Sequence, residues 1–167
     1  MEIERKWLVD DWPKDLKLIK TEHMRQGYIC TSPTVRIREE RCGDETSFVL
    51  CIKSKPHDEK RLSRTEVEIK ITEKDFRELE GTLPASLMEK ERRVYELPDG
   101  LMLEVNLVEL GDEAYRYAEI EFDSIDLAEN FLPEGDLCKY LEKEVTSDKS
   151  YTMASKWKEH ICRQKLL

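Results

Sequence analysis

Apolar and polar side chains alternate along most of this chain with a period of two, which is typical of β-strands that have one buried face. In residues 63–71, for example, valine and isoleucine alternate with glutamate and lysine. The pattern predicts a fold dominated by antiparallel strands. The alternating segments are the N-terminus from Glu2 and residues 35–38, 47–55, 63–71, 88–97, 101–110 and 117–122, with the phase of 88–97 ambiguous.

Helical periodicity is found in three shorter stretches. Thr72 with Asp75 resembles a capping box and opens the first of them, residues 72–83. The other helices are expected at residues 124–131 and from about residue 151 to residue 166.

Turn residues separate these segments, and no stretch is rich enough in proline or serine to serve as a linker. Turns are expected at residues 32–33, 42–44 and 97–100, and the last should join two strands as a hairpin. At 167 residues without an internal repeat, the chain is expected to form a single α+β domain, residues 1–167.

Composition narrows the classes of function. Charged residues make up 39% of the chain and the net charge is -9, so nucleic acids and anionic membrane surfaces are not expected as partners. Five cysteines without a CxxC pair are typical of reduced thiols, and no apolar run reaches the length of a membrane span, so we expect a cytoplasmic protein. Because the chain has no glycine-rich phosphate loop, any phosphate chemistry must use side chains.

The polar faces of the strands carry charges of particular kinds. Same-face neighbours in a strand lie about 7 Å apart, so the long side chains of a Glu-x-Glu pair can converge on one hard cation. Arginine and lysine at the same spacing suit phosphoryl oxygens. The charges are either solvated groups on a wet sheet face or the lining of a closed barrel that holds a metal and a polyanion, and their coincidence across strands favours the barrel. The glutamate pairs are Glu2/Glu4, Glu66/Glu68 and Glu119/Glu121.

The opening Glu2-x-Glu4-x-Lys6 resembles the ExExK signature of the CYTH superfamily, also called the triphosphate tunnel metalloenzymes. Further blocks resemble its small bacterial members in the same order and span nearly the whole chain. These blocks are Arg25-Gln26-Gly27-Tyr28, Val35-Arg36-Ile37-Arg38, Ile52-Lys53, Leu62-Ser63-Arg64 with Glu66 and Glu68, Glu89-Lys90-x-Arg92, Glu104-Val105, Ala118-Glu119-Ile120-Glu121 and Glu144-Val145-Thr146.

The resemblance implies an eight-stranded antiparallel β-barrel, a tunnel with a charged lumen and a few helices packed outside, that binds a linear triphosphate with Mg²⁺ or Mn²⁺. It also implies that a tunnel glutamate or a lysine of lowered pKa accepts the proton of an attacking water, with Lys90 and Glu66 as the candidates. By this resemblance the metal ligands are Glu2, Glu4, Glu119 and Glu121. The substrate-binding residues are Lys6, Arg25, Arg36, Arg38, Lys53, Arg64 and Arg92, and the catalytic residues are Lys90, Glu66 and Glu68.

Several activities are compatible with this fold. We favour hydrolysis of inorganic triphosphate to pyrophosphate and orthophosphate, because the compact bacterial members suggest it. Thiamine triphosphatase and class IV adenylate cyclase activity, the latter with a nucleoside triphosphate as substrate, are alternatives. So is a module that binds polyphosphate or nucleotide without turnover, because Asn106 stands where relatives often have aspartate and Ser150 where an arginine is expected. A homodimer is also compatible with the resemblance.

Overall fold

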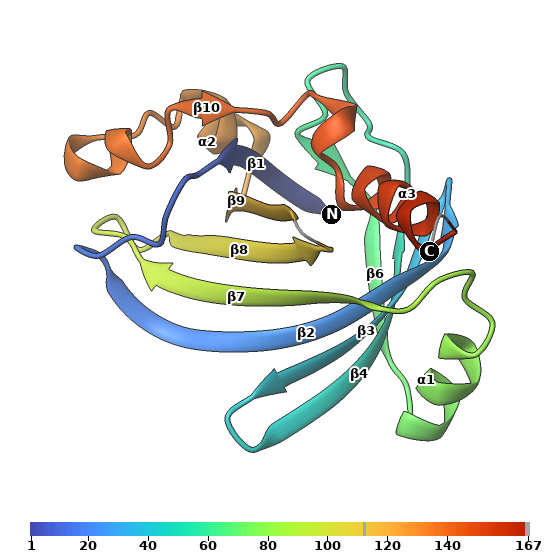
Figure 1. Cartoon of the computed structure of the whole chain (residues 1–167). Helices are drawn as coiled ribbons and strands as arrows, with labels where there is room; N and C mark the ends of the chain where they lie inside the picture. Colours follow the sequence, from blue (N-terminus) through green and yellow to red (C-terminus); the bar gives the residue numbers. More distant parts are fainter. Residues whose placement is uncertain (112, 166–167) are drawn as a thin grey trace.

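The structure, a computed structural model, describes residues 1–111 and 113–165 (Figure 1). Antiparallel strands dominate it, as the alternation predicts. The strands are β1 (Glu2–Leu8), β2 (Lys17–Thr31), β3 (Thr34–Cys42), β4 (Glu45–Lys53), β5 (Ser63–Arg64), β6 (Glu66–Lys70), β7 (Met88–Glu96), β8 (Met102–Leu110), β9 (Glu113–Glu121) and β10 (Lys143–Glu144). The helices are α1 (Glu73–Glu80), α2 (Ile125–Asn130) and α3 (Met153–Gln164), with short 3-10 turns η1 (Gly135–Lys139) and η2 (Lys149–Tyr151).

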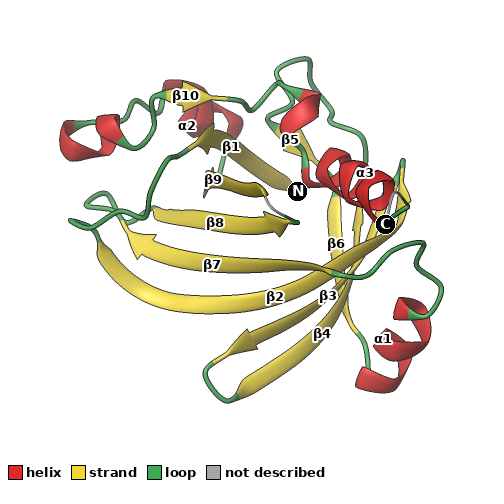
Figure 2. Ribbon diagram, viewed as in Figure 1, coloured by secondary structure: helices red, strands yellow, loops and turns green. Residues whose placement is uncertain are grey.

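The strands form one strongly curved sheet in the order β10-β1-β9-β8-β7-β2-β3-β4-β6 (Figure 2). The sheet closes on itself through residues 63–70, because β5 pairs with β1 while β6, one residue further along, pairs with β4. When β5 and β6 are counted as one interrupted strand, eight antiparallel strands of the described residues complete the circuit. The prediction of an eight-stranded α+β barrel is confirmed, with the two-residue β10 added beside β1.

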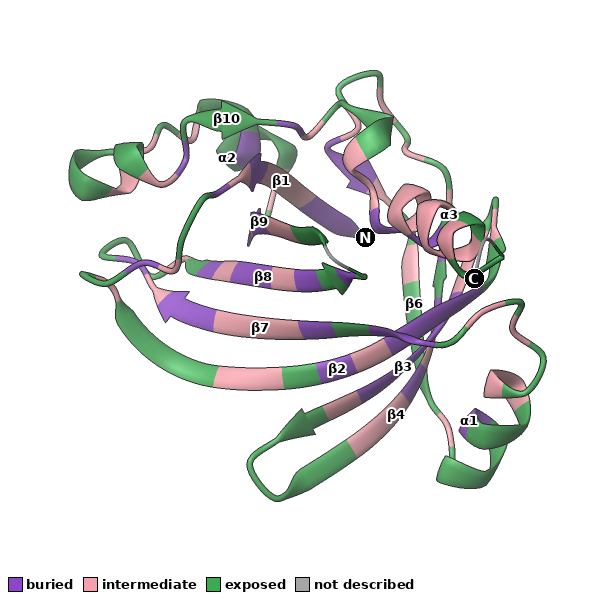
Figure 3. Cartoon of the chain, viewed as in Figure 1, coloured by how far each residue is buried: buried purple, intermediate pink, exposed green. Residues whose placement is uncertain are grey.

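Apolar side chains lie mainly on the outside of the barrel, where helices and loops cover them. Ile3 and Trp7 of β1 face outward, as expected, into a buried cluster that includes Ala128 of α2. Alternating buried and exposed positions along the strands are visible in Figure 3. On another face, α1 buries Phe76 against Ile37 of β3. Because most apolar side chains pack between the outer face of the sheet and the helices and loops, the inward-facing positions of the strands can carry polar and charged side chains.

Helix α3 departs from the expectation that the helices only pack outside. It lies at one end of the barrel and places Met153 and Trp157 against Tyr28, Val108 and Tyr117. The last three occupy inward positions of β2, β8 and β9. The C-terminal helix therefore fills part of one end of the tunnel with apolar side chains.

Local sequence signals are confirmed where they were strong. The Thr72 side chain caps α1 by accepting a hydrogen bond from the Asp75 amide, and Ser124 caps α2 in the same way. Residues 97–100 form the β7–β8 hairpin turn. The long strand β2 had no clear alternation, and its pairing shifts by one residue at two irregularities. Among residues 1–111 and 113–165, none of the helices combines the length and the apolar character that crossing a bilayer requires.

Candidate active site

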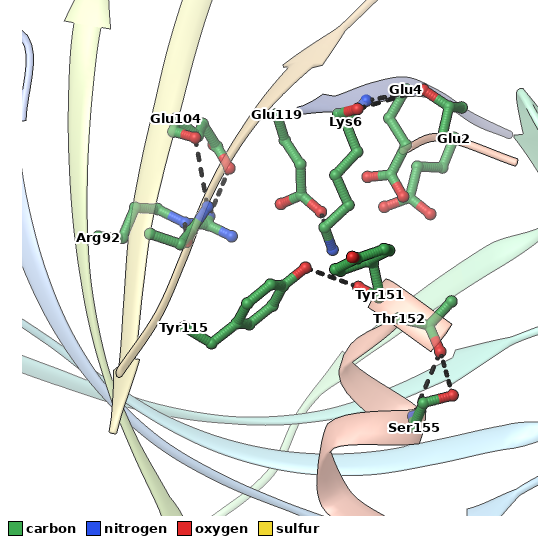
Figure 4. Close-up of polar contacts among 12 residues, drawn as sticks. Glu2, Glu4, Lys6, Arg92, Glu104, Tyr115, Glu119, Tyr151, Thr152 and Ser155 are labelled. Atoms are coloured by element: carbon green, nitrogen blue, oxygen red, sulfur yellow. Dashed lines mark hydrogen bonds and ion pairs between the residues drawn. The ribbon is translucent and has the colours of Figure 1, made fainter. Parts of the chain in front are cut away.

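Strand register decides which charges face the lumen. In an antiparallel pair, residues opposite each other project to the same face of the sheet. Glu4 lies opposite Glu121, and Lys6 lies opposite Glu119, which is in turn opposite Glu104. The same phase, followed around the sheet, directs the glutamate pairs and the strand cations to the inside of the barrel. Figure 4 shows Glu2, Glu4, Lys6 and Glu119 in the lumen, with Arg92 and Glu104 further along the wall.

One cavity of about 980 Å³ occupies this lumen. It brings together every metal-ligand, substrate-binding and catalytic residue named from the sequence, except Arg25. The predicted residues that line it are Glu2, Glu4, Lys6, Arg36, Arg38, Lys53, Arg64, Glu66, Glu68, Lys90, Arg92, Glu119 and Glu121.

Three of the four predicted metal ligands, Glu2, Glu4 and Glu119, form ion pairs with lumen cations. Lys53 Nζ lies 2.6 Å from Glu2 Oε1, and Arg64 Nε lies 2.5 Å from Glu2 Oε2. Arg64 also pairs with Glu4, and Lys6 Nζ lies 3.1 Å from Glu119. A cation that bound these glutamates would have to displace some of these partners.

The donor set fits a hard divalent cation, which prefers carboxylate oxygens. Burial, together with the carboxylates of Glu119 and Glu2, raises the pKa of Glu4 to about 7. Burial followed by the charge of Glu2 raises the pKa of Glu121 as well. Both shifts come first from burial and then from neighbouring carboxylates, and a bound divalent cation would favour the charged form of these groups.

A second group of metal-ligand types lies nearby. Among the described residues, Cys51 Sγ and carboxylate oxygens of Glu66 and Glu68 lie within 4.8 Å of one another. Lys53 Nζ is 3.1 Å from Glu66, and Arg38 donates a 2.9 Å hydrogen bond to Glu68. Burial raises the pKa of the Cys51 thiol to about 11, so the thiol stays protonated at neutral pH. This group is therefore less suited to a metal than the predicted glutamates.

The opposite wall of the lumen is cationic. Arg36 and Arg38 are buried, and the Arg36 Nε has no hydrogen-bond partner among the described residues. Arg92 Nη1 lies 3.0 Å from Glu104, and its Nε donates a 3.1 Å hydrogen bond to Asn106 Oδ1. An arginine whose donors are only partly satisfied in a polar cavity is suited to binding phosphoryl oxygens.

Lys90 differs from the other lumen cations. It is buried, and it lies in the lumen wall two positions from Arg92. Burial and then the positive charge of Arg92 lower the pKa of Lys90 well below the usual value for lysine. Burial alone would raise the pKa of Glu119, but the charges of Lys6, Lys90 and Arg92 lower it to about 2.

Arg25 does not line this cavity, and it is the one predicted substrate-binding residue that the structure does not place with the others. It lies opposite Glu39 and Glu89, on the outer face of β2. Its guanidinium is 3.0 Å from the buried Glu39, and it also pairs with Glu80 of α1. Glu39 pairs in addition with Arg77 of α1 at 3.5 Å. Arg25 therefore belongs to an ion-pair network that holds α1 on the barrel.

The structure adds cavity residues for which no role was predicted. Glu104 lines the cavity beside Arg92, and its place in the Glu104-Val105 block, which resembles the family, could have marked it as a site residue. Tyr28 and Tyr117 also line it, and Lys6 Nζ lies 3.8 Å above the Tyr117 ring. At the C-terminal segment, Lys149 lines the cavity instead of the neighbouring Ser150, whose hydroxyl donates to Asp148.

Comparison with known proteins places these observations in a family. No family model matches the chain. The inorganic triphosphatase of Nitrosomonas europaea is 34% identical over 151 residues, which cover 90% of this chain and 92% of that protein. A solved structure of the inorganic triphosphatase NE1496 is 30% identical, has a TM-score of 0.59 and is matched over 93% of this chain and 96% of its own.

More distant structures share the fold. HpAC1 from Hippeastrum, whose structure is described as revealing a dominant triphosphatase activity, has a TM-score of 0.60 over 77% of this chain and 83% of its own, at 18% identity. The PH1819 protein of Pyrococcus horikoshii has a TM-score of 0.58 over 76% of this chain and 81% of its own, at 22% identity. With the tunnel topology and the curated relative, these matches show that the chain belongs to the CYTH superfamily, the triphosphate tunnel metalloenzymes.

Proposed function

We propose that this protein hydrolyses inorganic triphosphate to pyrophosphate and orthophosphate with the help of a divalent cation, Mg²⁺ or Mn²⁺. The observation that carries the proposal is the lumen itself, in which glutamates from four strands and cations from five strands line one cavity of about 980 Å³. The relationship to the inorganic triphosphatase of Nitrosomonas europaea supports the choice of substrate.

Glu2, Glu4, Glu119 and Glu121 would hold the cation, with Glu66 and Glu68 beside it. A bound divalent cation neutralises phosphoryl oxygens and acidifies a coordinated water. The protein's part is to present four carboxylates from two paired strands, and the clustering of their negative charges in a buried site favours cation binding.

The lumen cations would bind the triphosphate chain. Arg36, Arg38 and Arg92 offer forked donors, while Lys6, Lys53 and Arg64 can turn from their glutamate partners to phosphoryl oxygens. Triphosphate carries several negative charges, and moving them out of water is costly unless they are paired. The lumen cations supply the opposite charges that make burial of the triphosphate favourable. Fixed cations around the leaving pyrophosphate would also stabilise the transition state, which is the main requirement of phosphoryl transfer.

Lys90 is better suited than Glu66 to accept the proton of the attacking water. Hydrogen bonding to Glu2 and the charge of Lys53 overcome the effect of burial and lower the pKa of Glu66 to about 2, which makes it a weak base. The lowered pKa of Lys90 favours a neutral amine, which can accept a proton. In this step, the water oxygen bonds to the terminal phosphorus, the bond to the bridging oxygen breaks, and the water proton moves to the Lys90 amine.

The aromatic lining gives less support to nucleotide or thiamine substrates. Trp7, Trp12 and Trp157 do not line the cavity. Of the aromatic residues that do, Tyr28, Tyr117 and Phe122 are buried, and the Lys6 ammonium covers the Tyr117 ring. Tyr151 is partly buried and stacks on Tyr115, so it is the one of these four rings that leaves some surface on which a base or thiazolium ring could stack.

A substrate panel with product identification tests the proposal. Purified protein with Mg²⁺ or Mn²⁺ should release pyrophosphate and orthophosphate from tripolyphosphate, and chelation with EDTA should stop the release. Cyclic AMP from ATP would identify a cyclase instead, and tight binding of tripolyphosphate without any product would identify a binding module. The cytoplasmic location and the homodimer stay predictions, and light scattering on the purified protein tests the second.

A further inference from the structure

The two ends of the tunnel carry opposite charges. The β7–β8 turn and the connection from β9 to α2 lie at one end of the barrel, and the β2–β3 turn and the loop after β4 lie at the other (Figure 1). At the first end the cavity is lined by Glu104, Glu121 and Asp123, which we call the acidic mouth. At the second end, α3 fills part of the opening with apolar side chains, and the rest of the opening is lined by Lys55, Arg61, Lys149 and Lys158, which we call the basic mouth.

The basic mouth is built from two parts of the chain that are far apart in sequence, the loop after β4 and the C-terminal segment. Lys55 and Arg61 belong to the loop between β4 and β5, Lys149 belongs to η2, and Lys158 belongs to α3. Within the described residues, none of these four side chains forms an ion pair of 4.0 Å or less, although most lumen cations do. Asp148 also lines this end and contributes one negative charge, with its carboxylate hydrogen-bonded to Ser150. Four cations against this one carboxylate leave a net positive charge at the mouth.

Arg61 is held in place by an unusual backbone. Its φ is 61°, in the left-handed region that arginine rarely adopts. The loop is fixed by Asp58, whose carbonyl accepts from the Arg61 amide at 3.2 Å and whose carboxylate accepts from the amides of Leu62 and Ser63. The Arg61 Nε is buried in this position and has no hydrogen-bond partner among the described residues. Backbone strain and an unsatisfied buried donor both cost stability, and such costs are concentrated at ligand sites.

We propose that the basic mouth is the entrance and exit for the polyanionic substrate, and that Arg61 is its first anchor. The inference rests on the proposed function, since it concerns the route of the same triphosphate. Fixed positive charge at one opening attracts a multivalent anion and raises its association rate, while the acidic mouth repels it. The acidic mouth instead attracts cations and adjoins the predicted metal ligand Glu121.

Charge reversal at the mouth tests the route. The triple variant Lys55→Glu, Lys149→Glu and Lys158→Glu should lower kcat/KM for tripolyphosphate about tenfold at an ionic strength of about 20 mM, with kcat nearly unchanged. The difference should shrink to within about twofold at about 500 mM, because salt screens exposed charges. The matched control, Lys14→Glu, Lys17→Glu and Lys74→Glu, changes the net charge equally at exposed positions away from the cavity and should retain kcat/KM. Equal kcat/KM in the two triple variants at low salt would overturn the proposal.

Arg61 is tested by a separate pair of variants. Arg61→Asn removes the charge and introduces a residue that tolerates the left-handed backbone conformation, whereas Arg61→Lys keeps the charge. Calorimetry with tripolyphosphate in EDTA should show about fivefold weaker binding for the asparagine variant and partial recovery for the lysine variant. Unchanged binding in Arg61→Asn would exclude Arg61 as an anchor. These titrations do not require turnover, so an inactive wild-type protein would refute the proposed hydrolysis while leaving the route measurable.

Discussion

Lys53 donates a 2.6 Å hydrogen bond to the carboxylate of Glu2, 51 residues away in the chain. The two residues belong to β4 and β1, which are not neighbours in the sheet. Lys53 is one of the residues assigned to phosphate binding, and Glu2 is one of those assigned to the metal. Without metal and substrate, these two side chains neutralise each other's charge. Binding of a metal by Glu2 and of a phosphate by Lys53 each require this pair to separate, so the two binding events should favour each other.

Replacement of Lys53 should therefore change the two affinities in opposite directions. Lys53→Met removes a cation beside Glu2 and Glu66, so the affinity for Mn²⁺ without substrate should rise several-fold. The same change removes a phosphate contact, so KM for tripolyphosphate should rise by about tenfold. Calorimetry with Mn²⁺ and steady-state kinetics measure the two effects, with Lys74→Met as an exposed control. A loss of both affinities would refute the coupling.

The glutamates assigned to the metal should be essential for turnover. Glu4→Gln and Glu121→Gln keep the side-chain shape but remove the charge that holds a hard cation, so kcat/KM should fall by about 100-fold or more. Activity should return in part at high Mn²⁺ concentration. Glu109→Gln, at an exposed position of β8, serves as the control. Wild-type rates in both lumen variants would contradict the ligand assignment.

Arg38 and Arg25 lie on adjacent strands but on opposite faces of the barrel, and so form a matched pair. Arg38→Ala should lower kcat/KM for tripolyphosphate by about tenfold or more, because a charge-assisted phosphate contact is worth about 1.5–3 kcal/mol. Arg25→Ala should leave kcat/KM within about twofold and lower the melting temperature, because it breaks the network around Glu39. A lower kcat/KM for Arg25→Ala with an unchanged melting temperature would show that Arg25 takes part in substrate binding.

Glu39 should matter for stability and not for catalysis. Its carboxylate is buried and pairs with Arg25, Arg41 and Arg77. Glu39→Gln leaves three guanidinium groups around a neutral amide, so the free energy of unfolding should fall by about 2 kcal/mol or more. Urea denaturation measures the loss, and Glu113→Gln, which removes an exposed ion pair with Arg163, should cost less than about 1 kcal/mol. Equal losses would show that the Glu39 network contributes no more than a surface pair.

Much of the fold could be read from local pattern. The period-two segments became strands because a side chain in a strand reaches only one of two faces, and Thr72 and Ser124 capped helices because their hydroxyls satisfy free amides. The long strand β2 could not be read in this way. Its register shifts between Leu18 and Lys20 and again between Tyr28 and Cys30, so no single alternation runs through it.

The position of Arg25 has a different explanation, because the register is regular between Arg25 and Tyr28. Arg25 and Tyr28 are three residues apart, so in a regular stretch of strand they face opposite sides of the sheet. Tyr28 lines the cavity, and Arg25 consequently points to α1. This alternation of faces could be read from the sequence. The resemblance to a family motif does not say which face of the strand each residue of the motif occupies.

By itself, the sequence determined which residues alternate, which turns and caps bound the elements, and which charges share a strand face, because these depend on neighbours within a few positions. Only the tertiary structure decided that the charged faces close around a common lumen, that Glu2, Glu4 and Glu119 each meet a particular cation, and that one mouth is basic and the other acidic. The physical reason is that closure and pairing depend on register between strands distant in the chain, which no local pattern encodes.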